Sequence, residues 1–348
     1  MKNGILFSLM LLARALPAQF LQAPPSGDNQ QSIVSQSISG VSTVTVRYNS
    51  PDVNGRQGKI WGQLVPYGQL WRAGANENTT IQFSTAARVE GHEVPAGTYG
   101  LFMIPGETEW TVVLSNTNSA WGAFEYDEKE DLLRFPAKPE PAAFHEYLNF
   151  EFTVRQPEYT VLALQWENLA IPFRIEVAAQ ELVLESFKKQ LRGDIGLFFW
   201  EGPHQAAKYC LDHNIALDQG LSWVNQSVRI RAQFTNLMTQ SELLEKAGRS
   251  ADAKTAYELA FKVAGPNDLY YHGRSLLEQQ QTDQAMAIFQ QNFERYGALY
   301  VTQLGLGRGY KAKGERTLAL QHLQAALQLA ELPRQKNSVE ALMADLKK

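Results

Sequence analysis

The chain has 348 residues, of which 44% are hydrophobic and 11% aromatic, so it is long and apolar enough to bury a full core and to form two domains. Its formal net charge is -4, from 32 basic and 36 acidic side chains, and it has no long basic run. This balance excludes the electrostatic footprint of a nucleic-acid-binding protein or of a protein that adheres to an anionic membrane.

The first residues have the order of an export signal. Lys2 precedes an apolar run over residues 5–13, and small residues at 15–18 resemble a cleavage region, although Arg14 interrupts the order. The apolar run is too short to span a bilayer. We predict a cleaved signal peptide over residues 1–18 and a flexible leader over residues 19–31. The mature protein is then expected to be periplasmic or secreted, soluble, without a lipid anchor and not inserted in a membrane.

Cys210 is the only cysteine, so an exported chain of this sequence forms no internal disulfide and depends on packing for its stability. Its neighbours in sequence are mostly apolar and no paired base lies close by. We therefore expect a buried, inert thiol at Cys210 and not a nucleophile.

Residues 32–178 alternate short strands with turns. Val44, Val46 and Tyr48 alternate with polar residues, which is the period-two pattern of a half-buried strand. Similar runs occur at residues 79–84, 99–104, 110–114, 147–154, 159–166 and 171–177. No helical segment separates these runs, so the pattern predicts an antiparallel β-sandwich or barrel. Its one long connection, over about residues 50–75, is where such folds usually carry function.

The pattern becomes helical over residues 179–348, where residues 182–230 are expected to supply two or three helices. From about residue 232, the small residue Ala253 recurs at Ala285 and Ala319, close to the ~34-residue period of the tetratricopeptide repeat. A second small position recurs upstream of each: Ser241, Gly273 and Gly307. The segment therefore resembles degenerate tetratricopeptide repeats without the signature tryptophan. The fold class predicted for the whole chain is an all-β domain followed by an all-α helical-hairpin domain.

Four segments of the β-rich half carry a resemblance to a known family. They read, in order, YNSPDVNGRQGKIWGQLVPYGQLWRAGANENTTIQFS, VEGHEVPAGTYGLFMIPGETEWTVVLSN, AWGAFEYDEKEDLLRF and TVLALQWENLAIPFRIEV. The match resembles the domain-of-unknown-function 2911 family of exported bacterial proteins and covers roughly residues 32–177, with the box WRAGANE intact at 71–77. The turn before Ile60 departs from the family at Asp52, Gln57 and Gly58. The resemblance implies kinship and no particular chemistry.

No catalytic or metal-binding motif accompanies these patterns. The chain has neither a helical metalloprotease motif nor a G-x-S-x-G elbow, and no two of its six histidines have ligand spacing. The glycine-rich run at 305–309 follows no strand, and the acidic stretch at 125–131 lacks the alternating donors of a calcium loop. We therefore expect no metal and no cofactor.

The densest group of apolar and polar side chains lies at residues 64–80. In one interpretation, Arg56 and Arg72 bind an anionic or polyol ligand, with Asn76 orienting it and Glu77 acting as an acceptor or general base. In the other, which we favour, Arg72 and Glu77 form an ion pair that fastens the long connection. The ligand-binding candidates are Arg56, Trp71, Arg72, Asn76, Glu77, Trp121 and Tyr126, of which the last two are aromatics that either stack on a sugar or cap the sandwich.

Two functions follow from these patterns. The first is an exported, non-enzymatic binding or scaffold protein, whose repeats bind a protein or peptide while the sandwich binds a small polar ligand, a glycan or a second surface. The alternative is a carbohydrate- or cell-wall-active hydrolase or lyase that uses Arg72, Asn76 and Glu77. Glu77 has no second carboxylate at a known separation, so the sequence alone cannot build the mechanism.

Overall fold

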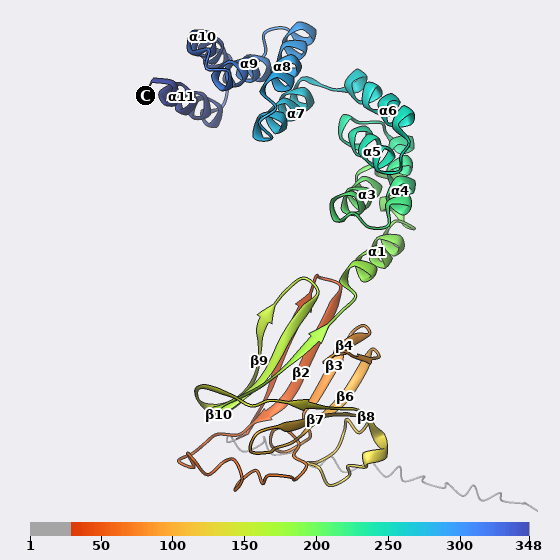
Figure 1. Ribbon diagram of the computed structural model, residues 1–348, viewed down its shortest axis with the longest axis vertical. Coiled ribbons are helices and arrows are strands. Elements are labelled where there is room, and N and C mark those ends of the chain that lie inside the picture. The colour runs from red at the N-terminus through yellow and green to blue at the C-terminus, as the bar shows by residue number, and fades with distance from the viewer. Residues whose placement is uncertain (1–28, 348) are drawn as a thin grey trace, which may run out of the picture. The chain divides into compact units, whose positions relative to one another are not determined.

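The computed structural model describes residues 29–347 (Figure 1). The chain divides into two compact units between Val183 and Leu184, called here the β-unit and the helical unit. The predicted signal peptide and nearly all of the predicted leader lie outside the described residues.

The β-unit consists of two antiparallel sheets, which confirms the predicted all-β class of this half. The six-stranded sheet has the order β1-β2-β3-β6-β7-β8 and contains β1 (Gln30–Ile38), β2 (Ser42–Ser50), β3 (Thr80–Phe83), β6 (Gly97–Ile104), β7 (Trp110–Ser115) and β8 (Asp131–Ala137). The four-stranded sheet has the order β5-β4-β10-β9 and contains β4 (Ala87–Val89), β5 (His92–Val94), β9 (Glu140–Arg155) and β10 (Tyr159–Glu176). A short 3-10 helix, η1 (Glu128–Glu130), precedes β8.

The strand pattern of the sequence misses β1, β4, β5 and β8 and divides β10 in two. β1 is rich in polar residues and buries only Ile38, so its place is set by continuous pairing with β2 at the edge of the sheet. β10 is a single strand whose register with β9 shifts on both sides of Glu167. Glu167 has φ 53, a left-handed conformation that bulges the strand and breaks the apolar alternation there.

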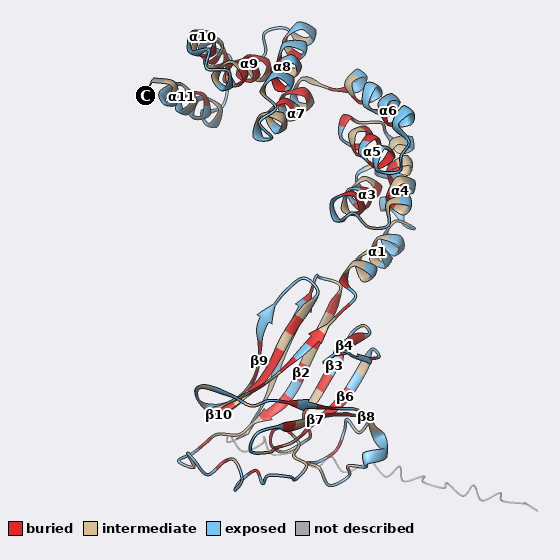
Figure 2. Ribbon diagram, in the orientation of Figure 1, coloured by how far each residue is buried: buried red, intermediate tan, exposed pale blue. Residues whose placement is uncertain are grey.

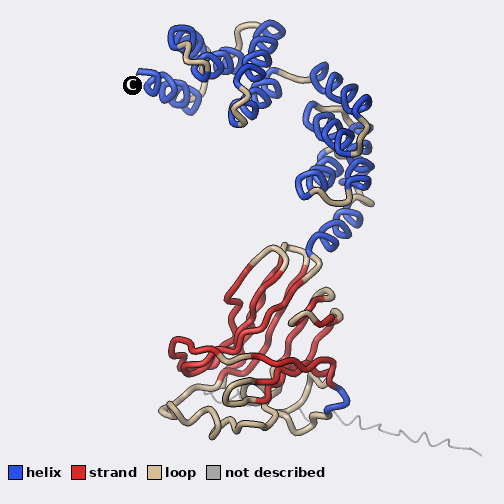
Figure 3. The backbone as a smooth tube through the Cα atoms, viewed as in Figure 1, coloured by secondary structure: helices blue, strands red, loops and turns tan. Residues whose placement is uncertain are grey.

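One hydrophobic core joins the two sheets. Figure 2 shows the buried residues along β2 and β10, and the core includes the fully buried Trp110 and Trp166. Residues 51–79, which connect β2 to β3, have almost no regular secondary structure (Figure 3), yet Val53, Ile60 and Val65 from this connection are buried in the same core. The long connection is therefore packed onto the sandwich through its apolar residues.

The remaining elements are helices arranged as consecutive hairpins, as predicted. α1 (Ala179–Gln190) crosses the division between the units. It is followed by α2 (Asp194–Phe198), α3 (Glu201–His213), α4 (Leu217–Ile230), α5 (Phe234–Lys246), α6 (Ser250–Val263), α7 (Pro266–Glu278), α8 (Thr282–Tyr296), α9 (Tyr300–Ala312), α10 (Arg316–Gln328) and α11 (Pro333–Lys347). In the described part of the chain, no helix is both long and apolar enough to cross a membrane.

The recurring small residues lie where paired helices touch. Ser241 on α5 donates a hydrogen bond from Oγ to the carbonyl of Ala253 on α6, at 2.8 Å. At Gly273 on α7, a Cβ atom would lie 2.4 Å from the Phe289 ring of α8, so only glycine allows these helices to approach so closely. Cys210 on α3 is fully buried, as expected, and burial raises the pKa of its thiol.

Candidate functional site

The long connection of the β-unit is held in place at Trp71. Trp71 and Met103 of β6 exchange two backbone hydrogen bonds, each 2.8 Å long. The indole Nε1 of Trp71 donates to the carbonyl of Gly74 at 3.1 Å, which closes the turn that carries Arg72. The indole of Trp71 is therefore fixed by its own backbone and by the neighbouring strand.

Trp71 belongs to a cluster of four tryptophans with Trp61, Trp110 and Trp166. Trp61 lies edge-on to the other three, with ring centroids 5.0–5.8 Å apart. The rings of Trp71 and Trp166 are nearly parallel, with an interplanar angle of 17° and centroids 6.2 Å apart. Edge-to-face pairs of this kind add to the stability gained from burial alone. The indole Nε1 atoms of Trp61 and Trp166 are buried without a hydrogen-bond partner.

A cavity of about 410 Å³ lies beside this cluster. Its lining includes Asp52, Arg56, Leu64, Trp71, Arg72 and Trp166. Three of the seven predicted site residues, Arg56, Trp71 and Arg72, thus come together around one space. Trp166 and Asp52 were not among the predicted site residues. Their place in the site depends on contacts between segments far apart in sequence, which no local pattern reports.

Arg56 is occupied by its own turn. Its Nε donates to the carbonyl of Val53 at 3.0 Å, and its Nη2 donates to the carbonyl of Asp52 at 2.8 Å and to the Asp52 carboxylate at 3.2 Å. The carboxylate balances the guanidinium charge. Arg56 therefore shapes and closes one wall of the cavity, and its charge is already paired.

Arg72 is partly buried, as Arg56 is, but it has no such partners. Its Nε atom is buried without a hydrogen bond, and within residues 29–347 its guanidinium forms no ion pair. Burial lowers the pKa of Arg72 from its usual value. An arginine nevertheless keeps its charge in proteins, so Arg72 brings an unpaired cation to the cavity.

The predicted ion pair between Arg72 and Glu77 is not formed. Glu77 is exposed, and its carboxylate accepts a hydrogen bond from Nδ2 of Asn49 on β2 at 3.0 Å. Asn76 donates from Nδ2 to the carbonyl of Asn29 at 3.4 Å. Neither Asn76 nor Glu77 lines the cavity. The three residues of the hydrolase hypothesis therefore do not face one common space.

Trp121 and Tyr126 also lie outside the cavity lining. Trp121 is 59% exposed and forms an isolated backbone bridge with Glu77. Tyr126 donates from its hydroxyl to the carboxylate of Asp131 at 2.6 Å and accepts a hydrogen bond from Arg134. Burial and this carboxylate raise the pKa of Tyr126 to about 12. Tyr126 is thus committed to local contacts, while Trp121 remains an exposed aromatic on the adjoining loop.

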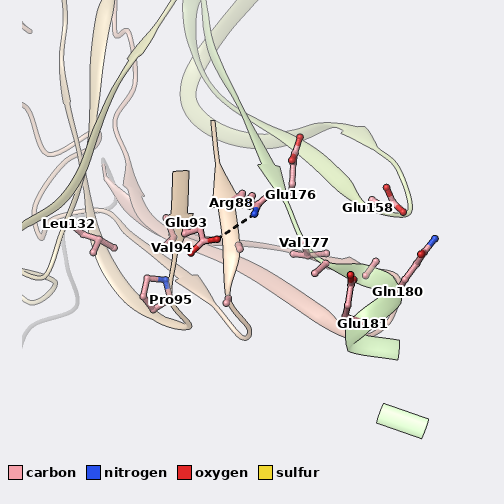
Figure 4. A pocket seen from close by; sticks show the side chains of 14 residues that line it. Arg88, Glu93, Val94, Pro95, Leu132, Glu158, Glu176, Val177, Gln180 and Glu181 are labelled. Atoms are coloured by element: carbon pink, nitrogen blue, oxygen red, sulfur yellow. Dashed lines mark hydrogen bonds and ion pairs between the residues drawn. The ribbon is translucent and has the colours of Figure 1, made fainter. Parts of the chain in front are cut away.

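A larger cavity, of about 870 Å³, lies elsewhere on the β-unit (Figure 4). It is formed by β4, β5, the end of β10 and the start of α1, and four glutamates line it: Glu93, Glu158, Glu176 and Glu181. Arg88, its one lining cation, pairs with Glu93 at 3.4 Å. Across residues 29–347, no three acidic, histidine or cysteine side chains are placed to hold a metal ion. This cavity is larger, but among the described residues it offers neither an unpaired cation nor a metal-ligand group, and we therefore do not assign the candidate functional site to it.

Comparison with protein families supports the resemblance predicted for the β-rich half. The family model described as "Protein of unknown function (DUF2911)" matches residues 29–175, which is nearly the whole β-unit. A search of curated proteins finds no sequence that matches this chain.

Solved structures similar to this chain match about half of it. The Cut9-Hcn1 hetero-tetramer of the APC/C matches 48% of this chain and 35% of its own, at 16% identity and a TM-score of 0.30. YrrB, a TPR protein with an unusual peptide-binding site, matches 46% of this chain and 83% of its own, at 15% identity and a TM-score of 0.28. A tetratricopeptide repeat protein from Parabacteroides merdae matches 48% of this chain and 64% of its own, at 16% identity and a TM-score of 0.30. This chain thus spans about a third of the first structure and about two thirds of the last.

Proposed function

We propose that this protein is an exported, non-enzymatic binding scaffold whose helical unit binds a protein or peptide segment. The observation that carries the proposal is a group of tyrosines and arginines shared by α7 and α9, called here the α7/α9 face: Tyr271, Arg274, Tyr300 and Arg308. Tyrosine and arginine are the residue types enriched at the energetic centres of protein interfaces.

The groups of the α7/α9 face are close enough to affect one another. The pKa of Tyr300 is raised by burial and by Tyr270 and Tyr271, and it is lowered by Arg308. Tyr271 is 62% exposed, so it offers most of its ring to an incoming chain. Nε of Arg308 is buried without a hydrogen-bond partner. A peptide that supplies acceptors here would satisfy a donor that the protein leaves unpaired.

The packing below this face makes it a stable platform. Tyr270, Phe289 and Leu304 belong to one buried cluster that joins α7, α8 and α9. A rigid surface loses little conformational entropy when a partner binds. Stacked helical hairpins also present extended surfaces, which suit a peptide better than a small molecule.

A peptide-display library screened with the full-length protein tests the proposal. We expect the screen to yield peptides that bind saturably. The double variant Tyr271→Ser/Arg308→Gln should bind these peptides about tenfold more weakly. The matched control is Tyr257→Ser on α6, where a 41% exposed tyrosine lies off the α7/α9 face; it should bind within about twofold of wild type. The proposal would be refuted if no peptide of the library bound saturably, or if the double variant bound the peptides as tightly as wild type.

A second binding role, for the β-unit, is favoured by the cavity beside Arg72. A concave space of this size, lined by both apolar and polar groups, can hold a small molecule. We propose that a small polar ligand binds there, independently of the partner of the helical unit.

A further inference from the structure

Two hydrogen-bond donors of the cavity have no acceptor. Nε of Arg72 and Nε1 of Trp166 are both buried and unpartnered, and both residues line the same space. Trp166 is only 1% exposed, so solvent does not satisfy its N–H. Buried donors without partners are rare in folded proteins. Two of them around one cavity point to an acceptor that the protein does not itself supply.

The charged side chains that line the cavity, Asp52, Arg56 and Arg72, have a net charge of one positive unit. The Asp52 carboxylate neutralises the Arg56 guanidinium through an ion pair of 3.2 Å. Arg72 has no anion beside it within residues 29–347. A ligand with a single negative charge would balance the site. A dianion would exceed that balance and would also meet the Asp52 carboxylate on the same lining.

The rest of the lining combines apolar and polar groups. Trp71 and Leu64 supply apolar surface, and Asn29 and Asn54 are polar. The apolar body of a ligand can pack against Trp71, where an aromatic contact stabilises it beyond area burial alone. About 410 Å³ is within the range that small organic molecules occupy.

We propose that this cavity binds a small organic monocarboxylate, with the carboxylate held by Arg72 and the indole N–H of Trp166, and with its apolar body packed against Trp71 and Leu64. Arginine matches the planar carboxylate with two parallel donors. Phosphate is less suitable because the long connection contains no helix N-terminus and brings only one unpaired cation. The inference rests on the small-ligand role proposed for the β-unit, and it does not depend on the α7/α9 face.

Titration of the full-length protein with benzoate tests the inference. The tryptophan cluster supplies the fluorescence signal, and calorimetry gives an independent affinity. We expect saturable binding of benzoate, with the neutral isostere benzamide and inorganic phosphate each about tenfold weaker or worse, because hydrogen bonds to a charged acceptor are the stronger ones. Binding of benzamide as tight as that of benzoate, preferential binding of phosphate, or no saturable binding of benzoate would overturn the assignment.

Variants separate Arg72 from nonspecific attraction of anions. Arg72→Gln should weaken benzoate binding about 10- to 100-fold. Arg88→Gln is the matched control, because Arg88 is a cation of the same unit that lines the other cavity. The affinity of this variant for benzoate should equal that of wild type. Thermal unfolding of each variant confirms that it is folded. Equal benzoate affinity in wild type and a folded Arg72→Gln would refute the inference, whereas loss of peptide binding at the α7/α9 face would leave it intact.

Discussion

The two units of this protein differ in how their buried residues are connected. In the β-unit one core joins both sheets and the long connection between β2 and β3. In the helical unit the buried residues are divided among four smaller clusters, each shared by neighbouring helices. A single core unfolds as one cooperative body, while stacked hairpins gain stability mainly from nearest neighbours. A destabilising substitution should therefore lower stability throughout the β-unit, whereas in the helical unit it should affect only neighbouring helices.

The largest effect is expected for Trp110→Ala in the β-unit. Trp110 is 1% exposed and contacts Trp61 and Trp71 within the tryptophan cluster. Removing such a side chain leaves a large cavity and should cost about 3–5 kcal/mol of unfolding free energy. Hydrogen exchange should show lost protection in both sheets. Loss confined to β7 would contradict a single cooperative core.

Trp121→Ala is the control for this prediction. Trp121 is 59% exposed and lies outside the core cluster. Its removal should change the unfolding free energy by less than about 1 kcal/mol.

A smaller and more local effect is expected for Gly273→Ala in the helical unit. The added Cβ would lie 2.4 Å from the Phe289 ring, so α7 and α8 must separate or the ring must move. Such overpacking typically costs about 1–3 kcal/mol, even though alanine favours the helix. Exchange protection should fall in α7, α8 and α9 and remain in α3 and α4.

Gly193→Ala is the matched glycine for this comparison. Its nearest neighbour, the carbonyl oxygen of Gln190, would lie 3.6 Å from the new Cβ, which is an ordinary contact. We expect a change within about 0.5 kcal/mol. A uniform loss of protection along the whole helical unit in Gly273→Ala would contradict local coupling.

A third and smaller effect concerns pH and His272 on α7. Burial lowers the pKa of His272, whose ring packs edge-to-face against those of Phe234 and Phe261. The unfolded chain therefore binds a proton more readily than the folded one. The stability contribution is present above the unfolded pKa of about 6.5 and is lost as pH falls from there through the folded value.

His272→Gln should reduce the loss of helical stability between pH 7 and pH 5, measured by urea unfolding monitored by circular dichroism. Some pH dependence should remain, because burial also lowers the pKa values of His204 and His322. An unchanged pH dependence in the variant would show that His272 is not protonated differently in the folded and unfolded chains.

The sequence predicts best those features that repeat at short range. The small residues Ser241, Gly273 and Gly307 are recognisable because the same position recurs in successive hairpins, and each lies at a helix–helix contact. Alternation within strands likewise predicts the buried positions of Val44, Val46 and Tyr48. The strand pattern depends on the local period of the backbone, and the helical pattern depends on a repeat of about 34 residues.

The candidate site is less predictable because it depends on contacts across the fold. Glu77 lies five residues after Arg72, yet it is bound by Asn49 from another strand and Arg72 is left unpaired. Trp166 reaches the cavity from β10, with a bulge at Glu167 that no alternation pattern indicates. The residue types of the site were therefore predictable, and their pairing was not.

The central claim is that Arg72 is held unpaired for a ligand and is not part of a clasp. The most direct test is the unfolding free energy of Arg72→Met, measured by urea denaturation with tryptophan fluorescence in the absence of ligand. Methionine keeps an apolar side chain and removes the buried, unpaired charge, so we predict stability equal to or above that of wild type. A loss of about 3 kcal/mol or more, as expected when a buried ion pair is broken, would contradict the claim.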